Sequence, residues 1–139
     1  MFRIAAYLNF FLAIAHLLAM VSLEKVFQIY GINKEMDMLA QLHPSLPYII
    51  TIVVALVFFV FGLYALSADG RIRKLPLLKL AVFGIAAVFL LRSVLGIIEM
   101  VFTNTSFSLE LTNTLGAFFI GFLYLWGGIK KWNIIKKQA

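Results

Sequence analysis

Four long apolar stretches are the feature that most constrains what this chain can fold into. They run approximately over residues 4–23, 48–68, 75–102 and 109–129. Each is long enough to cross a hydrocarbon core of about 30 Å as a helix, which takes about 20 residues. The stretches are continuous rather than alternating, and an open sheet cannot satisfy its backbone polar groups in lipid. The sequence therefore predicts an all-α integral membrane protein, a bundle of four transmembrane helices.

The composition excludes a water-soluble fold. Of the 139 residues, 63% are hydrophobic and only 13% are charged, far from the balance that a soluble domain needs. We expect residues 1–139 to form a single membrane domain, because a chain of this length has no room for a separate catalytic domain. The absence of cysteine excludes thiol nucleophiles, disulfides and cysteine-based metal or redox centres.

The first apolar stretch has a second interpretation, a cleaved signal peptide. Arg3 precedes it and small residues end it near Ala19, as in a secretory signal. Its length, together with Asn9 and His16 inside it, favours a span that stays in the protein.

The connections between the stretches differ in length. The first, residues 24–47, is the longest, and Asn33 in it is a suitable N-cap for a short surface helix that ends before His43-Pro44. The two shorter connections carry turn-forming residues, among them Gly70 and Asn104. We expect the surface helix to lie across the outer mouth of the bundle.

Lysine and arginine are sorted between the two sides of the predicted bundle, which predicts its orientation. One side carries Arg3, Arg71, Arg73, Lys74, Lys79, Lys130, Lys131, Lys136 and Lys137. The other side has only Lys25 and Lys34, among the acidic residues Glu24, Glu35, Asp37 and Glu110. Because Lys and Arg accumulate on the cytoplasmic side, we expect the N-terminus, the second connection and the C-terminus to be cytoplasmic. This topology accounts for the net charge of +6 without nucleic-acid binding.

The basic C-terminal tail predicts contact with anionic lipid. Lys130-Lys131-Trp132, followed by Lys136-Lys137, has the pattern of an interfacial anchor with its tryptophan at head-group depth. We expect a multi-pass protein of the bacterial inner (plasma) membrane, with membrane lipids as partners and a homo-oligomer or a partner membrane protein left open. In a eukaryotic source, Lys136-Lys137-Gln138-Ala139 resembles a dilysine retrieval signal and would indicate the endoplasmic reticulum membrane.

Ionisable residues inside the spans are the main functional signal, because they are costly in hydrocarbon and usually face a bundle interior. His16 lies 13 residues after Arg3, and Arg92 lies 13 residues after Lys79. At 1.5 Å per residue, both should sit about 20 Å from the basic surface, in the outer half of the membrane. Glu99 follows Arg92 by seven residues on the same helix face, so the two side chains can meet directly or through water.

Other polar and small residues extend this signal to all four helices. Asn9, Ala13, His16 and Met20 form one stripe at helical spacing, and Asn113, Ala117, Gly121, Tyr124 and Gly128 form another. Stripes of small residues let helices approach closely. We therefore predict a polar pocket that opens toward the outside. Its candidate ligand-binding residues are His16, Arg92, Glu99, Asn113, Asn9, Thr51, Ser93 and Thr112.

A purely structural role for these residues is the main alternative. In that interpretation Arg92 and Glu99 form an internal ion pair that holds the bundle together, and His16 donates a hydrogen bond to a nearby carbonyl. A metal site at His16 and His43 lacks an obvious third ligand, and haem ligation by His16 has no further support, so we predict no metal site. Phosphate-binding loops and nucleophile elbows are missing from the sequence, and the cofactor stays open.

A resemblance covers nearly the whole chain. It rests on Ala15-His16-Leu17, on the run from Gly62 to Ser67, on Leu75 to Leu78, and on the run from Val88 through Arg92 to Gly96. These segments resemble a family of small bacterial integral membrane proteins with four predicted spans, and more loosely the DoxX-like proteins, a few of which are linked to quinone-coupled oxidation. Some family members are labelled phosphopantetheine adenylyltransferase. That activity needs a Rossmann-like fold and a His-x-Gly-His motif, which this sequence lacks, so the resemblance implies a fold and a pocket only.

Three classes of function follow. The first is an accessory or sensing protein that binds a lipid or quinone head-group, with Arg92 at an anionic or carbonyl oxygen and His16 as a second hydrogen bonder. The second is a membrane-embedded enzyme on a lipid-like substrate, with His16 or Glu99 as general acid or base. The third is a small transporter or an oligomeric pore assembled through faces such as Ala117 and Gly121.

Overall fold

The computed structural model describes residues 1–30, 32–102 and 107–138, and the side chains of these ranges except residues 30, 33 and 134–138. Asn104 of the third connection, Ala139 and the side chains of Lys136 and Lys137 lie outside this description. The described residues form helices joined by short turns and contain no strand. Four helical segments are long and apolar enough to cross a membrane, which confirms the predicted all-α membrane bundle.

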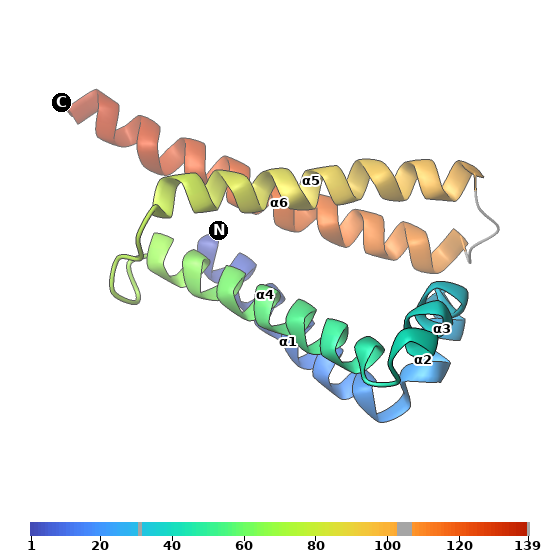
Figure 1. Cartoon of the computed structure of the whole chain (residues 1–139). Coiled ribbons are helices and arrows are strands. Elements are labelled where there is room, and N and C mark those ends of the chain that lie inside the picture. The colour runs from blue at the N-terminus through green and yellow to red at the C-terminus, as the bar shows by residue number, and fades with distance from the viewer. Residues whose placement is uncertain (31, 103–106, 139) are drawn as a thin grey trace.

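The helices follow one another along the chain with short links (Figure 1). Helix α1 (Phe2–Ala19) continues through the 3-10 turn η1 (Met20–Ser22) into α2 (Leu23–Tyr30), and a short helix, α3 (Asn33–Leu42), precedes α4 (Leu46–Ala68). After a loop come α5 (Leu78–Phe102) and α6 (Phe107–Gln138). The first apolar segment therefore extends over Phe2–Ile29, further than the apolar stretch in the sequence indicated.

Helix α3 is the surface helix expected in the first connection. It ends at Leu42, immediately before His43-Pro44. Its N-cap is Ile32, one residue before Asn33, which was expected to take that position. Helices α2 and α3 lie together at one end of the bundle, beside α4 (Figure 1).

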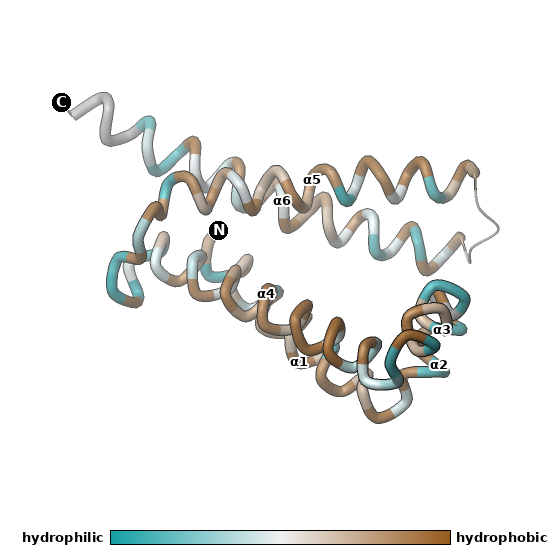
Figure 2. The backbone as a smooth tube through the Cα atoms, viewed as in Figure 1, coloured by the Kyte–Doolittle hydropathy of each residue, from teal (hydrophilic) through white to brown (hydrophobic). Residues whose placement is uncertain are grey.

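The long helices associate as two antiparallel pairs. Helix α1 packs mainly along α4, and α5 packs mainly along α6. The pairs meet at the end that carries the N-terminus and the α4–α5 loop, and they diverge toward the end that carries α2 and α3 (Figure 1). We call these the basic end and the outer end. Figure 2 shows hydrophobic residues along the four long helices and hydrophilic residues gathered at the α4–α5 loop and in α2 and α3.

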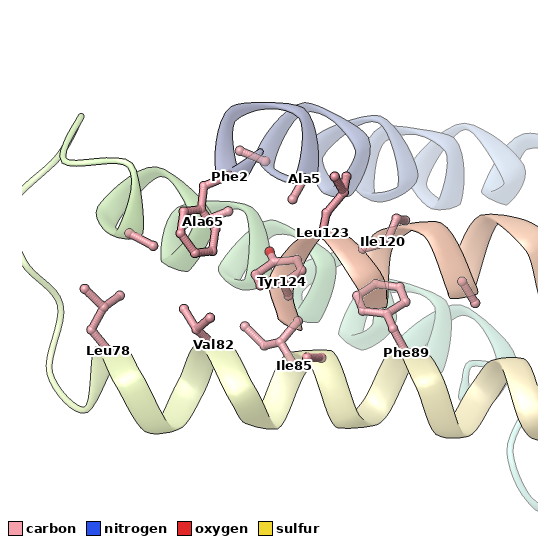
Figure 3. Packing of buried hydrophobic residues seen from close by; sticks show 14 residues of the cluster. Phe2, Ala5, Ala65, Leu78, Val82, Ile85, Phe89, Ile120, Leu123 and Tyr124 are labelled. Atoms are coloured by element: carbon pink, nitrogen blue, oxygen red, sulfur yellow. The ribbon is translucent and has the colours of Figure 1, made fainter. Parts of the chain in front are cut away.

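The buried core that joins all four helices lies in the basic half of the bundle. Side chains of Leu78, Val82 and Ile85 on α5 point toward Tyr124 of α6 and toward α1 and α4 (Figure 3). Along α5 and α6 this core ends outward at Phe89 and Ala117. The complete core is Phe2, Ala5, Ala6, Ala65, Ala68, Leu78, Val82, Ile85, Ala86, Phe89, Ala117, Ile120, Leu123 and Tyr124.

Small residues explain why the helices pack closely in this half. The stripe expected on α6 faces inward, with Ala117, Gly121, Tyr124 and Gly128 all buried. At Gly62 of α4 a Cβ atom would lie 2.5 Å from a ring carbon of Phe10, so a side chain there would displace the Phe10 ring of α1. Close helix approach in lipid depends on such positions.

Polar contacts fix the basic end. Helix α4 ends in a Schellman motif, in which Gly70 has a φ of +77° and Arg71 N–H donates to the Leu66 carbonyl at 3.0 Å. The Arg3 Nε donates to Asp69 Oδ2 at 2.7 Å and so ties α1 to this turn. Lys131 Nζ on α6 donates to the Ala68 carbonyl at the end of α4. Together these contacts hold both helix pairs at one end.

Candidate functional site

The polar site in the outer half is built around Arg92, at the interface of α5 and α6. Its Nη1 lies 3.2 Å from Glu99 Oε2 on the same helix, and its Nη2 lies 2.9 Å from Glu110 Oε1 on α6. The predicted meeting of Arg92 and Glu99 is thus present as a direct contact. Two carboxylates hold one guanidinium, and the second carboxylate comes from the neighbouring helix.

Glu110 is the functional candidate that the sequence reasoning missed. The charge pattern places Glu110 among the acidic residues of the outer side. In the structure, α6 begins at Phe107, and Glu110 is buried in its first turn with 8% of its surface exposed. An acidic residue there also interacts favourably with the helix dipole. A signal was available, because Glu110 stands three residues before Asn113 and seven before Ala117 and so continues the inward-facing stripe of α6.

A glycine makes room for this ion-pair group. A Cβ atom at Gly96 would lie 2.9 Å from Glu110 Oε1 and 3.1 Å from Arg92 Nη1, and it would overlap the hydroxyl of Thr114. The Thr114 Oγ1 is buried and has no hydrogen-bond partner among the described residues. Arg92, Glu99, Glu110 and Thr114 therefore form one group, which we call the Arg92 cluster.

The Arg92 cluster differs chemically from the expected anion site. With all groups ionised, one guanidinium and two carboxylates leave a net charge of −1. Both terminal nitrogens of Arg92 already have carboxylate partners. The Thr114 hydroxyl, which has no partner among the described residues, and the net negative charge suit a cation or a hydrogen-bond donor better than an anion.

His16 lies apart from these contacts, on α1. Its Nδ1 lies 2.8 Å from the carbonyl oxygen of Leu12, one turn earlier on the same helix. A nitrogen that donates to this carbonyl carries the proton, so the neutral ring presents Nε2 as an acceptor. Both contacts of the structural alternative, the Arg92–Glu99 pair and a His16 bond to a carbonyl, are thus observed.

A row of aromatic rings runs from His16 across the bundle. The His16 ring centroid lies 5.1 Å from that of Phe58 on α4, Phe58 lies 6.1 Å from Phe89 on α5, and Phe89 stacks on Tyr124 of α6 at 6.4 Å. Phe89 is one turn before Arg92. Because Phe89 and Tyr124 belong to the basic-half core, the row connects His16 to that core at the level just before Arg92.

Asn9 takes part in a different hydrogen-bond chain, deeper in the bundle. It is fully buried, and its Nδ2 donates to the Ala5 carbonyl at 2.8 Å and to Tyr124 Oη at 3.2 Å. Tyr124 Oη in turn donates to the Phe61 carbonyl at 2.7 Å. The chain links α1, α6 and α4 and shares Tyr124 with the aromatic row, so Asn9 joins helices and makes no hydrogen bond to the Arg92 cluster.

The remaining candidates contribute less to the site. The Thr51 and Thr112 hydroxyls each donate, at 2.8 Å, to the carbonyl four residues earlier, Pro47 and Ser108 respectively. Such bonds occupy the hydroxyl within its own helix. Ser93, the residue after Arg92, is buried, and Asn113 on α6 is half-buried.

The structure thus unites Arg92 and Glu99 with Glu110 and Thr114, aligns His16 with the aromatic row, and leaves Asn9, Thr51 and Thr112 in other contacts. Among the described residues, no group of three or more His, Asp or Glu side chains is arranged to hold a metal ion. Comparison with known proteins assigns no relative, since no family model, no curated protein and no solved structure matches the chain.

Proposed function

We propose that this chain binds an amphiphilic small molecule, a lipid or a quinone, with its polar head beside the Arg92 cluster. One observation carries the proposal. The side chains of Arg92 and Glu99 are 42% and 49% exposed, although both belong to a helix apolar and long enough to span a membrane. An ionised side chain in hydrocarbon costs about 2.5–3.5 kcal/mol. A polar head group bound beside this exposed ion pair shields it from the hydrocarbon.

The charge of the Arg92 cluster defines the head group. With both Arg92 nitrogens held by carboxylates, the net −1 charge and the unpartnered Thr114 hydroxyl favour a head that donates hydrogen bonds or is cationic. The ammonium of an aminophospholipid and the hydroxyls of a quinol both meet this requirement. The role of Arg92 is then to hold Glu99 and Glu110 in place, rather than to bind an anion itself.

The apolar part of such a ligand lies against the aromatic row. Phe58 and Phe89 lie just inward of Arg92, and His16 flanks them from α1. The core that joins all four helices ends at this level, and the two helix pairs diverge beyond it (Figure 1). A ring or acyl chain packed against Phe58 and Phe89 buries apolar surface, while its head reaches the Arg92 cluster.

An accessory or sensing role suits this arrangement better than catalysis. Glu99 and Glu110 are both held by Arg92, and His16 Nδ1 is held by its own helix. These bonds build a fixed recognition group rather than a free acid and a free base. We further propose that the termini are cytoplasmic, that the membrane is the bacterial inner membrane, and that the chain belongs with the four-helix bacterial proteins that it resembles.

The test is to purify the protein in a mild detergent and to identify co-purified lipids and quinones by native and denaturing mass spectrometry. We expect one amphiphile at near-stoichiometric occupancy. Thr114→Val keeps the shape and all charges but removes the unpartnered hydroxyl, and Glu110→Gln removes one carboxylate charge. Each should weaken the affinity for the amphiphile about tenfold, the change that 1.4 kcal/mol of binding energy produces, and so lower its occupancy.

Glu35→Gln is the matched control, because Glu35 is an exposed carboxylate on α3. It should leave the occupancy unchanged. Equal ligand occupancy in wild type, Thr114→Val and Glu110→Gln, all monodisperse and helical, would overturn the proposal. So would a folded wild-type protein that carries no amphiphile from any native membrane extract.

A further inference from the structure

An open pocket lies at the basic end, where α5 begins and α6 emerges from the bundle. Its volume is about 670 Å³, and its lining includes Lys74, Pro76, Leu77, Lys79, Phe83 and Trp132. Cavities of this size hold small molecules and head groups. It is far along the helices from the Arg92 cluster, because Lys79 and Arg92 are separated by 13 residues of α5, or about 20 Å.

The wall of this cavity is aromatic. The ring of Phe83 on α5 lies 5.7 Å from that of Trp132 on α6, tilted by 42°. Gly128 supports it from below, since a Cβ there would come within 3.1 Å of the Phe83 ring. Tryptophan and other aromatic rings in membrane proteins concentrate at head-group depth. The wall therefore stands where the glycerol region of a phospholipid lies.

The rim is formed by a strained leucine. Leu77 has a φ of +52°, a conformation that costs a residue with a Cβ about 1–2 kcal/mol, and its side chain is 74% exposed. The loop that holds it is braced from α4, where Ser67 Oγ donates to the Arg73 carbonyl at 3.1 Å and accepts from Leu75 N–H at 2.9 Å. An apolar side chain held outward at this depth meets acyl chains rather than water.

The lysines at this cavity favour an anionic ligand. Three of the neighbouring cations already have partners: Arg3 and Arg71 pair with Asp69, and Lys131 donates to the Ala68 carbonyl. Within the described part of the chain, Lys74 and Lys79 have no ion pair or side-chain hydrogen bond, and no Asp or Glu lines the cavity. The first N–H groups of α5 open toward the same end and add to the positive potential.

We propose that this cavity binds one anionic phospholipid, with its phosphate between Lys74 and Lys79 and its glycerol and upper acyl region against Phe83, Trp132 and Leu77. A soluble phosphate would pair with the two lysines but would make no contact with the aromatic rings of Phe83 and Trp132 or with Leu77. This lipid would bind whether or not a ligand occupies the outer half. It would also bind whichever side of the membrane the basic end faces.

The experiment places the protein in nanodiscs of phosphatidylcholine containing a minor fraction of phosphatidylglycerol with brominated acyl chains. In a Trp126→Phe background, Trp132 is the only tryptophan and its fluorescence reports brominated chains in contact with the cavity. We expect quenching well above that of a random mixture, with half-saturation at about tenfold lower phosphatidylglycerol content than in Lys74→Gln/Lys79→Gln. The Lys74→Arg/Lys79→Arg protein should retain the wild-type preference and so shows that charge, not fold, is responsible.

Lys25→Gln/Lys34→Gln is the matched control, because it removes two exposed lysines from the opposite end. It should keep the wild-type quenching curve. Quenching that stays the same in folded Lys74→Gln/Lys79→Gln would overturn the proposal. Loss of the lipid preference on adding millimolar inorganic phosphate would also overturn it, because the site would then be one for a soluble anion.

Discussion

At Gly96 the absence of a side chain is what allows the Arg92 cluster to form. Glu110 Oε1, Arg92 Nη1 and the Thr114 hydroxyl all converge on the space that a Cβ would take. A charged group inside a membrane bundle needs this kind of close packing, because each partner that is pushed away leaves an ion without compensation. The glycine is therefore as necessary to the Arg92 cluster as the ionised residues are.

Gly96→Ala should destabilise the protein by about 1–3 kcal/mol, since the new methyl group forces the cluster to rearrange. Thermal unfolding in detergent, followed by circular dichroism, measures the change. Gly84→Ala is the matched control, because a Cβ at Gly84 on the same helix meets nothing within 4 Å. The control should be neutral or slightly stabilising, since alanine favours helix over glycine by about 1 kcal/mol. Equal stability of the two variants would contradict the assigned role of Gly96.

At the scale of the elements, the same arginine makes two contacts of different kinds. Its contact with Glu99 lies within α5, on side chains that are 42% and 49% exposed. Its contact with Glu110 joins α5 to α6 and involves a carboxylate side chain that is only 11% exposed. A pair that joins two helices stabilises their association, whereas a pair within one helix does not, and removing one partner of a buried pair leaves a buried charge without compensation. The α5–α6 contact should therefore be the stronger one.

Double-mutant cycles with Arg92→Gln test this ranking. We expect a coupling free energy of about 1 kcal/mol between Arg92 and Glu110, and of about 0.5 kcal/mol or less between Arg92 and Glu99. The four proteins of each cycle, with Glu110→Gln or Glu99→Gln as the second change, are compared by chemical unfolding in the same detergent. A coupling to Glu99 that exceeds the coupling to Glu110 would reverse our assignment of the pair that joins the helices.

At the scale of the whole molecule, the two ends of the bundle have different constructions. The basic end is closed by a four-helix core and by polar contacts from Arg3 and Lys131 to the end of α4. The outer end separates into two helix pairs, with α2 and α3 beside α4 (Figure 1). Flexibility and ligand entry should therefore concentrate at the outer end, because few buried contacts between the pairs hold it there.

Orientation is the prediction that belongs to this scale. The chain has no cysteine, so single cysteines placed at Arg71 and at Glu35 can be labelled without background. Because basic residues are retained on the cytoplasmic side, a membrane-impermeant maleimide added to intact cells should label position 35 and spare position 71. Permeabilised cells, in which both positions should react, supply the control. The reversed pattern in intact cells would invert the proposed topology.

The sequence by itself determined the four spans, the contrast between a basic and an acidic end, and the inward-facing stripe of α6. Hydrophobic length, charge position and helical spacing are local properties, so they can be read without knowing which helices touch. That Arg92 and Glu99 can meet followed for the same reason, because both lie on one face of one helix, and the structure shows that they meet directly.

Only the tertiary structure decided what depends on helix pairing. Because α5 pairs with α6, Glu110 leaves the outer surface and becomes the second partner of Arg92. Because α1 pairs with α4, His16 packs against Phe58 and does not join that ion pair. The cavity between Lys79 and Trp132 likewise exists only where α5 and α6 come together. Helix spacing fixes which residues share a face, but not which face meets which neighbour.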